Sequence, residues 1–300
     1  MREPPVDRMP FPQTIGRTVI FLLSPTGSPA VLGPAWSVLC GAWASGNWQW
    51  KADRLLALIL VLFIAEALWS AWRASLVDMN WSDYVSAHPL PARGDPVPQP
   101  PYTTPWSPLG RLLGWAGRLR RWMSETLPVE RRGALFTLPI LPPLILVLAA
   151  AVGQQMFILS LAALALSAIE WRVSRHRKAH KSLQAGLEIG LSWLAGHIVF
   201  GPLTWVSFTL ACCYALAYQG ALSLDSRRRS WGLALMYGGQ VSALALLIWL
   251  RYPLPAVVVG SLCAPQLLLV AGLAENREAW YLRRAAPFIM LSMLVAAWAV

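Results

Sequence analysis

Long apolar runs separated by short polar segments make up most of this chain. A helix needs about 20 consecutive apolar residues to cross a membrane, and nine segments approach that length. The sequence therefore predicts an all-α polytopic integral membrane protein of about nine spans, at residues 18–44, 55–77, 134–152, 156–171, 183–200, 203–224, 231–250, 253–273 and 285–300. A Pro-Thr-Gly-Ser-Pro break at residues 25–29 interrupts the first span.

The composition agrees with a membrane protein. Hydrophobic residues make up 56% of the chain and charged residues 13%, with a mean hydropathy of +0.49, whereas soluble domains usually have about 25% charged residues. The formal net charge of +11 could indicate nucleic acid or anionic lipid as a partner. In a polytopic protein, basic cytoplasmic loops explain the same excess, so we expect membrane lipid and no nucleic acid as a partner.

The positions of the basic residues predict the orientation. Of the 25 Lys and Arg residues, only Lys51, Arg54 and Arg251 fall on the side opposite the N-terminus when the nine spans alternate. Because cytoplasmic loops are enriched in Lys and Arg, we expect the N-terminus in the cytoplasm and the C-terminus outside. The predicted location is a cell membrane, namely a bacterial inner membrane.

The predicted organisation is a single membrane domain over residues 1–300, with two cytoplasmic parts. The first part is the N-terminal segment, residues 1–17. The second is a loop at 78–133, in which residues 88–108 are Pro-rich and typical of an extended linker. Residues 109–123 place apolar side chains at helical spacing with arginines between them, which predicts an amphipathic helix at the membrane surface. A short soluble helix packed on the loops is the alternative.

A polar helix face is predicted where the second span leaves the membrane. Positions 70, 71, 74 and 78 share one side of a helix, because neighbours three, four and seven residues apart lie on the same face. Glu66 lies within the apolar run and Arg73 near its end. A buried carboxyl such as Glu66 is either a structural hydrogen-bonding group or part of a ligand cavity.

Four stretches resemble one family, the UbiA-type intramembrane prenyltransferases. They are residues 22–30 with the apolar run that follows, the helix end at 66–83, the segment 187–196, and the segment 219–234, which contains Asp225 followed by three arginines. The resemblance implies a nine-span helical bundle with two Asp-rich motifs on the cytoplasmic side. It also implies that Mg²⁺ ions held by those carboxylates bind an isoprenyl diphosphate, whose ionisation gives a cation that an acceptor captures.

Both motifs depart from the family pattern. In the first motif Ser70 stands for an Asn, Ala71 and Ala74 stand for the first two Asp residues, and Asp78 keeps the last one. In the second motif Ala221 replaces the first Asp and Asp225 keeps the other. Each motif therefore retains one acidic residue.

Two physical interpretations of the predicted site stay open. Mg²⁺ often needs only one or two carboxylates, because phosphate and water complete its coordination, so Asp78 and Asp225 could each hold an ion, as metal ligands and catalytic residues, with Asn80 and Asp83 assisting. Alternatively, arginines could attract an anionic headgroup without metal, unless they only follow the orientation rule for basic loops. The ligand-binding candidates are then Glu66, Ser70, Arg73, Arg172, Arg227 and Arg228.

We therefore expect a UbiA-like membrane protein that binds an isoprenoid, quinone, pigment-like or similar lipid-soluble ligand. It would be a divergent or catalytically degenerate prenyltransferase homologue, and could be a subunit of a membrane complex. The alternative is an active Mg-dependent prenyltransferase that transfers an isoprenyl group to a lipid-soluble acceptor. A small-solute transporter is disfavoured, because the sequence shows no inverted repeat of interrupted helices.

Overall fold

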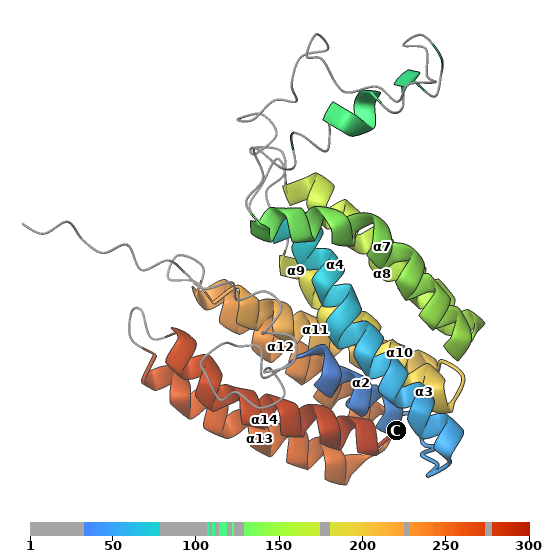
Figure 1. Cartoon of the computed structure of the whole chain (residues 1–300). Helices are drawn as coiled ribbons and strands as arrows, with labels where there is room; N and C mark the ends of the chain where they lie inside the picture. The colour runs from blue at the N-terminus through green and yellow to red at the C-terminus, as the bar shows by residue number, and fades with distance from the viewer. Residues whose placement is uncertain are drawn as a thin grey trace, which may run out of the picture. The chain divides into compact units, whose positions relative to one another are not determined.

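The computed structural model describes residues 33–78, 107, 110–111, 114–118, 122, 129–174, 181–224, 229–273 and 278–300 (Figure 1). The chain divides into two units. Unit 1 comprises Met1–Pro25 and Met79–Pro139, and unit 2 comprises Thr26–Asp78 and Ile140–Val300. We describe each unit by itself.

The described residues form helices and no strand, so the predicted all-α class is confirmed. The helical elements are α2 (Pro34–Trp43), α3 (Ala52–Leu62), η2 (Phe63–Trp69), α4 (Ser70–Arg73), η3 (Ala74–Asp78), α7 (Val129–Val152), α8 (Gln154–Ser174), α9 (Lys181–Ala185), η4 (Gly186–Leu191), α10 (Ser192–Phe200), α11 (Trp205–Leu222), α12 (Arg229–Trp249), α13 (Pro253–Ala271) and α14 (Glu278–Trp298).

Six helices in the described part of the chain are long and apolar enough to cross a membrane. They are Ala52–Val77, Gln154–Val173, Lys181–Phe200, Trp205–Leu222, Arg229–Trp249 and Pro253–Ala271. The other predicted spans correspond to α2, to the shorter apolar segment Thr137–Val152 and to α14. The membrane character is thus supported, whereas the count of nine spans stays a prediction.

Glycines allow two pairs of helices in unit 2 to approach closely. On α2 and α10, a Cβ atom at Gly41 would meet the Trp193 carbonyl, and one at Gly196 would meet the Val38 carbonyl. On α11 and α12, Gly220 and Gly239 likewise face backbone of the opposite helix. Small residues are the usual means of close helix packing in membranes, so these contacts fix how α2 crosses α10 and how α11 crosses α12.

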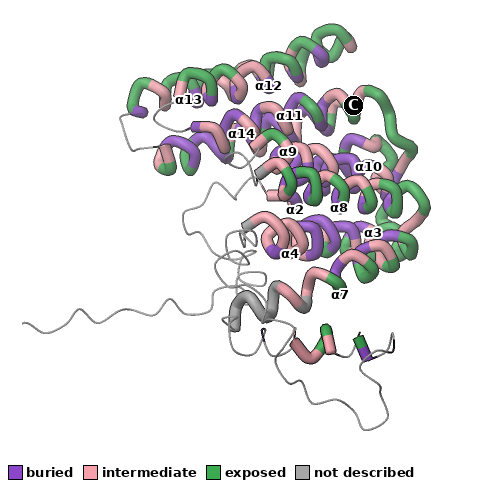
Figure 2. The backbone as a smooth tube through the Cα atoms, turned by 90° about the horizontal axis from the view of Figure 1, so that it is seen from above, coloured by how far each residue is buried: buried purple, intermediate pink, exposed green. Residues whose placement is uncertain are grey.

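Two clusters of buried apolar residues form the core of unit 2. One includes Trp193, Tyr214 and Tyr281, and the other includes Ile64, Trp69 and Ile145. Burial is nearly continuous along α10, whereas most of α13 is half-buried or exposed (Figure 2). Because apolar side chains such as Leu254 and Leu268 on α13 are each 78% exposed, this helix presents a face suited to lipid.

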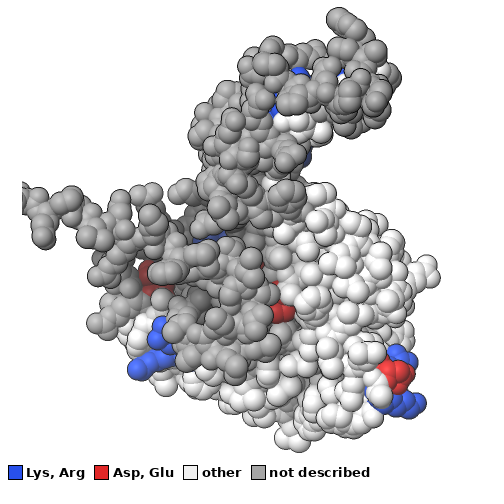
Figure 3. Space-filling model, in the orientation of Figure 1, with Lys and Arg blue, Asp and Glu red and all other residues white. Residues whose placement is uncertain are grey.

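Charge is scarce on the described surface. Figure 3 shows a largely uncharged face, with charged side chains near the ends of helices, including the starts of α3 and α14. Lys51, Asp53 and Arg54 are exposed at the α3 end, and Arg283 and Arg284 are exposed near the start of α14. This arrangement suits helices whose middles lie in an apolar medium.

In unit 1, several described residues within the predicted amphipathic segment are helical, namely Gly110, Arg111, 114–118 and Trp122. The Ser107 hydroxyl accepts a hydrogen bond from the Gly110 amide at 2.9 Å, as at a helix N-terminus. Trp122 is 5% exposed and Trp115 is 54% exposed. The position of this helix at a membrane surface stays a prediction, as do the boundaries of the two predicted cytoplasmic parts.

Candidate functional site

The candidate site is built around Arg73, the last residue of α4. Its Nε donates to Glu170 Oε2 at 2.9 Å and its Nη2 donates to Glu170 Oε1 at 2.8 Å. The Arg73 side chain is 11% exposed and the Glu170 side chain 1%. This pairing is bidentate, because two nitrogens of the planar guanidinium donate to the two oxygens of one carboxylate. It joins α4 to α8 inside unit 2.

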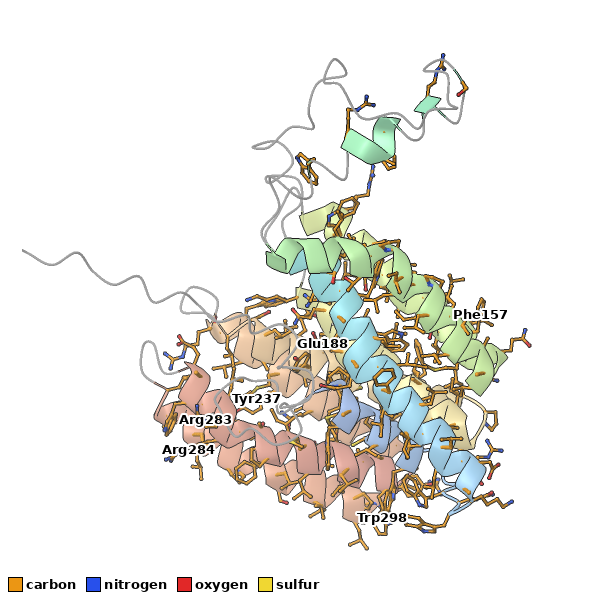
Figure 4. The ribbon with its side chains drawn as sticks, in the orientation of Figure 1. Phe157, Glu188, Tyr237, Arg283, Arg284 and Trp298 are labelled. Carbon is orange, nitrogen blue, oxygen red and sulfur yellow. The ribbon has the colours of Figure 1, made fainter. Side chains whose placement is uncertain are left out.

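Glu188 extends the network from Arg73 to three further elements. Its Oε1 lies 3.8 Å from Arg73 Nη1 and accepts a hydrogen bond from Gln184 Nε2 at 3.0 Å. Its Oε2 accepts from the Tyr218 hydroxyl at 2.7 Å. Glu188 lies on η4 between the helices of unit 2 (Figure 4). One guanidinium and two carboxylates, with Gln184 and Tyr218, therefore connect α4, α8, α9, η4 and α11.

Glu66 lies on η2, seven residues before Arg73, and its hydrogen bond is to a different part of the chain, the start of α2. Its Oε2 accepts a hydrogen bond from the Ala35 amide at 3.0 Å, at the first turn of α2. The first amides of a helix lack partners within the helix, and a carboxylate is favourable there. Of the two alternatives for Glu66, this hydrogen bond favours the structural one, and it anchors the start of α2 to the helix that carries Arg73.

Wide helical turns position these acidic residues. Glu66 lies in the π-helical segment η2 and Glu188 in the π-helical segment η4. Ser70 and Ser192 follow these segments, and each hydroxyl lies near the carbonyl five residues earlier, at 3.5 Å from Ala65 O and 3.3 Å from Leu187 O. Single π-helical turns inside longer helices are frequent at functional sites, because they turn side chains away from the ordinary helical register.

All four carboxyl oxygens of the network have partners. Both oxygens of Glu170 and both oxygens of Glu188 accept hydrogen bonds or contact Arg73. In the described part of the chain no group of three or more His, Cys, Asp or Glu residues could hold a metal ion. A Mg²⁺ ion would need oxygen ligands, and the oxygens of Glu170 and Glu188 are engaged with Arg73, Gln184 and Tyr218, so this pair as arranged does not fit a magnesium site.

The structure places some of the predicted site residues and leaves others undescribed. Arg73 joins the network and Glu66 binds the start of α2, whereas Ser70 bonds back to its own helix. Arg172 is exposed on α8, two residues after Glu170, and residues two apart do not share a helix face. The candidates outside the described residues or side chains are Asp78, Asn80, Asp83, Asp225, Arg227 and Arg228.

Sequence reasoning missed Glu170, Tyr218 and Gln184 as members of this network. A signal was present, because Glu66, Glu170 and Glu188 are carboxylic acids embedded in apolar runs. Arg73 is a basic residue in such a run, and ionisable groups there usually pair with one another. The partners could not be assigned from sequence, because Arg73 and Glu170 are separated by 97 positions.

Comparison with known proteins supports the membrane assignment. The chain is 28% identical over 290 residues to the bacteriochlorophyll synthase 34 kDa chain of Chloroflexus aurantiacus, an alignment that covers 88% of this chain and 84% of the relative. No family model and no solved structure matches the chain.

The homology confirms the predicted resemblance and supports an integral membrane location. The Arg73 network lies at the helix ends that the sequence assigns to the cytoplasmic side, where the resemblance to the UbiA-type prenyltransferases places both Asp-rich motifs. Arg73 itself stands between Ala71 and Ala74, which replace acidic residues of the first motif. The orientation of the termini stays a prediction.

Proposed function

We propose that this chain is a catalytically degenerate UbiA-type homologue that binds an isoprenoid or a similar lipid-soluble ligand in the membrane. The observation that carries the proposal is the pairing of Arg73 with Glu170 and Glu188. In place of the family's cluster of free carboxylates, the described residues hold an internal ion pair with satisfied hydrogen bonds.

Loss of ligating groups supports the same conclusion. Ala71, Ala74 and Ala221 stand where the resemblance implies Asp residues, and a methyl side chain has no oxygen to offer a metal ion. Arg73 adds a positive charge between two of these positions. Because a metal ion and a guanidinium repel one another, binding Mg²⁺ beside Arg73 is less favourable than in a carboxylate-lined site.

The ligand class follows from the membrane setting and the homology. The relative's name describes a bacteriochlorophyll synthase chain, which favours a pigment-like or isoprenoid ligand here over a soluble metabolite; a quinone is a further candidate of the same apolar class. That name also describes one chain of a stated size. It is consistent with this chain acting as a subunit of a larger membrane complex.

A binding titration tests the proposal. Purified protein in detergent is titrated with a fluorescent isoprenoid alcohol and with the corresponding diphosphate, each with and without Mg²⁺. We expect the alcohol to bind, the affinity for the diphosphate to be independent of Mg²⁺, and no release of diphosphate. Arg172→Ala is the matched control for Arg73→Ala, which removes the centre of the network, because Arg172 is an exposed arginine on α8 that does not join the network.

An active Mg-dependent prenyltransferase is the second candidate. It is favoured by the word synthase in the relative's name and by Asp78 and Asp225, which keep one acid in each motif. Diphosphate release that requires Mg²⁺, and that is lost in both Asp78→Asn and Asp225→Asn, would establish this activity and overturn degeneracy. If neither the isoprenoid alcohol nor its diphosphate binds, the isoprenoid-binding proposal is wrong.

A further inference from the structure

A groove separates α13 from α14 on the surface of unit 2. It has a volume of about 450 Å³ and is lined by Pro265, Leu268, Leu269, Arg284 and Phe288. Four of these five side chains are apolar, and Leu268 is 78% exposed. The groove therefore has a predominantly apolar wall with one positive charge.

Proline occurs in both helices that border this groove. Pro265 lies inside α13 and lines the groove, and Pro287 lies inside α14 next to Phe288. Proline cannot donate the hydrogen bond of a helix interior, and its ring crowds the preceding turn. A local departure from close helix packing is expected at such positions, so the two prolines explain why a groove forms here.

Arg284 is held next to the groove by an aromatic side chain. Its guanidinium carbon lies 4.7 Å from the ring centroid of Trp280, within the range of a cation–π contact. Trp280 in turn lies against the end of α13, since a Cβ atom on Gly272 would be 3.3 Å from its ring. Arg284 is thus oriented while staying exposed (Figure 4).

We propose that this groove binds an anionic phospholipid, with an acyl chain along Leu268, Leu269 and Phe288 and the phosphate at Arg284. Charge complementarity argues for this occupant, because a guanidinium binds phosphate oxygens with directed hydrogen bonds. The apolar wall argues for an attached chain, because an exposed apolar face of a membrane helix contacts acyl chains. The start of α14 also belongs to the end predicted to be cytoplasmic, where anionic lipids attract basic residues.

This site is separate from the Arg73 network, which involves α4, α8, α9, η4 and α11. Its occupation by a structural lipid is independent of whether the chain ionises a diphosphate. A lipid wedged between α13 and α14 would also cover part of the exposed face of α13. The inference therefore stands or fails apart from the proposed function.

Native mass spectrometry of the whole chain released from nanodiscs provides the test. Phosphatidylglycerol and phosphatidylcholine are offered in equal amounts, and retained lipid is counted for wild type, Arg284→Gln and Arg283→Gln. We expect one preferentially retained phosphatidylglycerol, with about fivefold weaker retention in Arg284→Gln. Arg283→Gln is the matched control, because it removes the adjacent exposed arginine, which does not line the groove.

A second variant tests the apolar wall. Leu268→Trp partly fills the groove without changing its charge, and because Leu268 is exposed the fold should tolerate the change. Retention of phosphatidylglycerol should fall in this variant too. Equal losses in Arg283→Gln and Arg284→Gln, equal retention of phosphatidylcholine, or unchanged retention in Leu268→Trp would each overturn the proposal. So would competition by soluble glycerol phosphate as strong as that by the lipid.

Discussion

Two regions of unit 2 contain buried polar contacts, and they use different chemistry. Around Arg73, a guanidinium and two carboxylates form charged contacts among α4, α8 and η4. Between α12 and α13, the amides of Gln240 and Gln266 bond reciprocally, at 3.0 and 2.9 Å, and both residues are fully buried. The first region carries ionised groups at high desolvation cost, and the second carries neutral groups that satisfy each other.

The difference in chemistry suggests different roles for the two regions: helix association for the glutamine pair and ligand binding for the Arg73 network. Neutral pairs such as the two glutamines hold membrane helices together at little cost. A buried ion pair is often no more stabilising than apolar residues of the same size, so packing alone does not account for the Arg73 network. Its π-helical neighbours and its position beside Ala71 and Ala74 are consistent with the binding site that we propose.

The largest expected effect follows removal of one ionic partner. Glu170→Ala leaves Arg73 largely buried without its bidentate acceptor, and breaking a buried pair costs about 3–5 kcal/mol. We expect a marked loss of thermal stability in detergent, measured by the loss of helical circular dichroism. The control Arg172→Ala should change unfolding by less than about 0.5 kcal/mol, as usual for an exposed residue. Similar curves for both variants would show that the pair is not formed in solution.

Two tyrosines allow a hydrogen bond to a carboxyl group and a hydrogen bond to neutral groups to be compared with the same substitution. Tyr218 donates to the Glu188 carboxylate at 2.7 Å, whereas Tyr214 contacts the Ser292 carbonyl at 2.8 Å and the Ser292 hydroxyl at 2.9 Å. Hydrogen bonds to charged groups contribute about 1.5–3 kcal/mol and neutral ones about 0.5–1.5 kcal/mol. Tyr218→Phe should therefore lower the unfolding free energy more than Tyr214→Phe. The reverse order would contradict the stronger contribution that we assign to the Tyr218–Glu188 hydrogen bond.

Replacing both ionic partners by apolar residues separates stability from binding. Because Glu188 also contacts Arg73, Glu188→Gln is added to Arg73→Met/Glu170→Met. No unpaired charge of the network then remains, so we expect a stability within about 1 kcal/mol of wild type. The isoprenoid titration is then repeated on this stable variant. Weakened binding would assign the ion pair to the ligand site, whereas unchanged binding would leave it a structural connection only.

The sequence predicted the class of fold well and the site only in part. Apolar runs of sufficient length are a local property, which is why helices were found at each predicted span within the described residues. The polar face before Asp78 drew attention to Glu66 and Arg73. Their partners Ala35, Glu170 and Glu188 come from other helices, and helical spacing contains no information about which helices become neighbours.

The π-helical turns were also beyond prediction from sequence. The helical spacing used for residues 70, 71, 74 and 78 assumes a regular turn, whereas η2 and η3 widen the helix on both sides of α4. Such turns arise from packing and from extra hydrogen bonds, like those of Ser70 and Ser192, and not from intrinsic propensity. The side chains of Asp78 and Asp225 lie outside the described residues, so their roles stay predictions.

The smallest expected effect concerns the neutral pair. Gln240→Leu/Gln266→Leu removes both amides together, so neither is left unsatisfied on a buried helix face. Side-chain hydrogen bonds between membrane helices average about 0.6 kcal/mol, and apolar packing should recover part of that loss. We expect an unfolding curve close to wild type and unchanged isoprenoid binding. The single variant Gln266→Leu should be less stable than the double variant, because Gln240 then loses its buried partner. If the double variant were as unstable as Glu170→Ala, the proposed difference between the charged and the neutral region would be wrong.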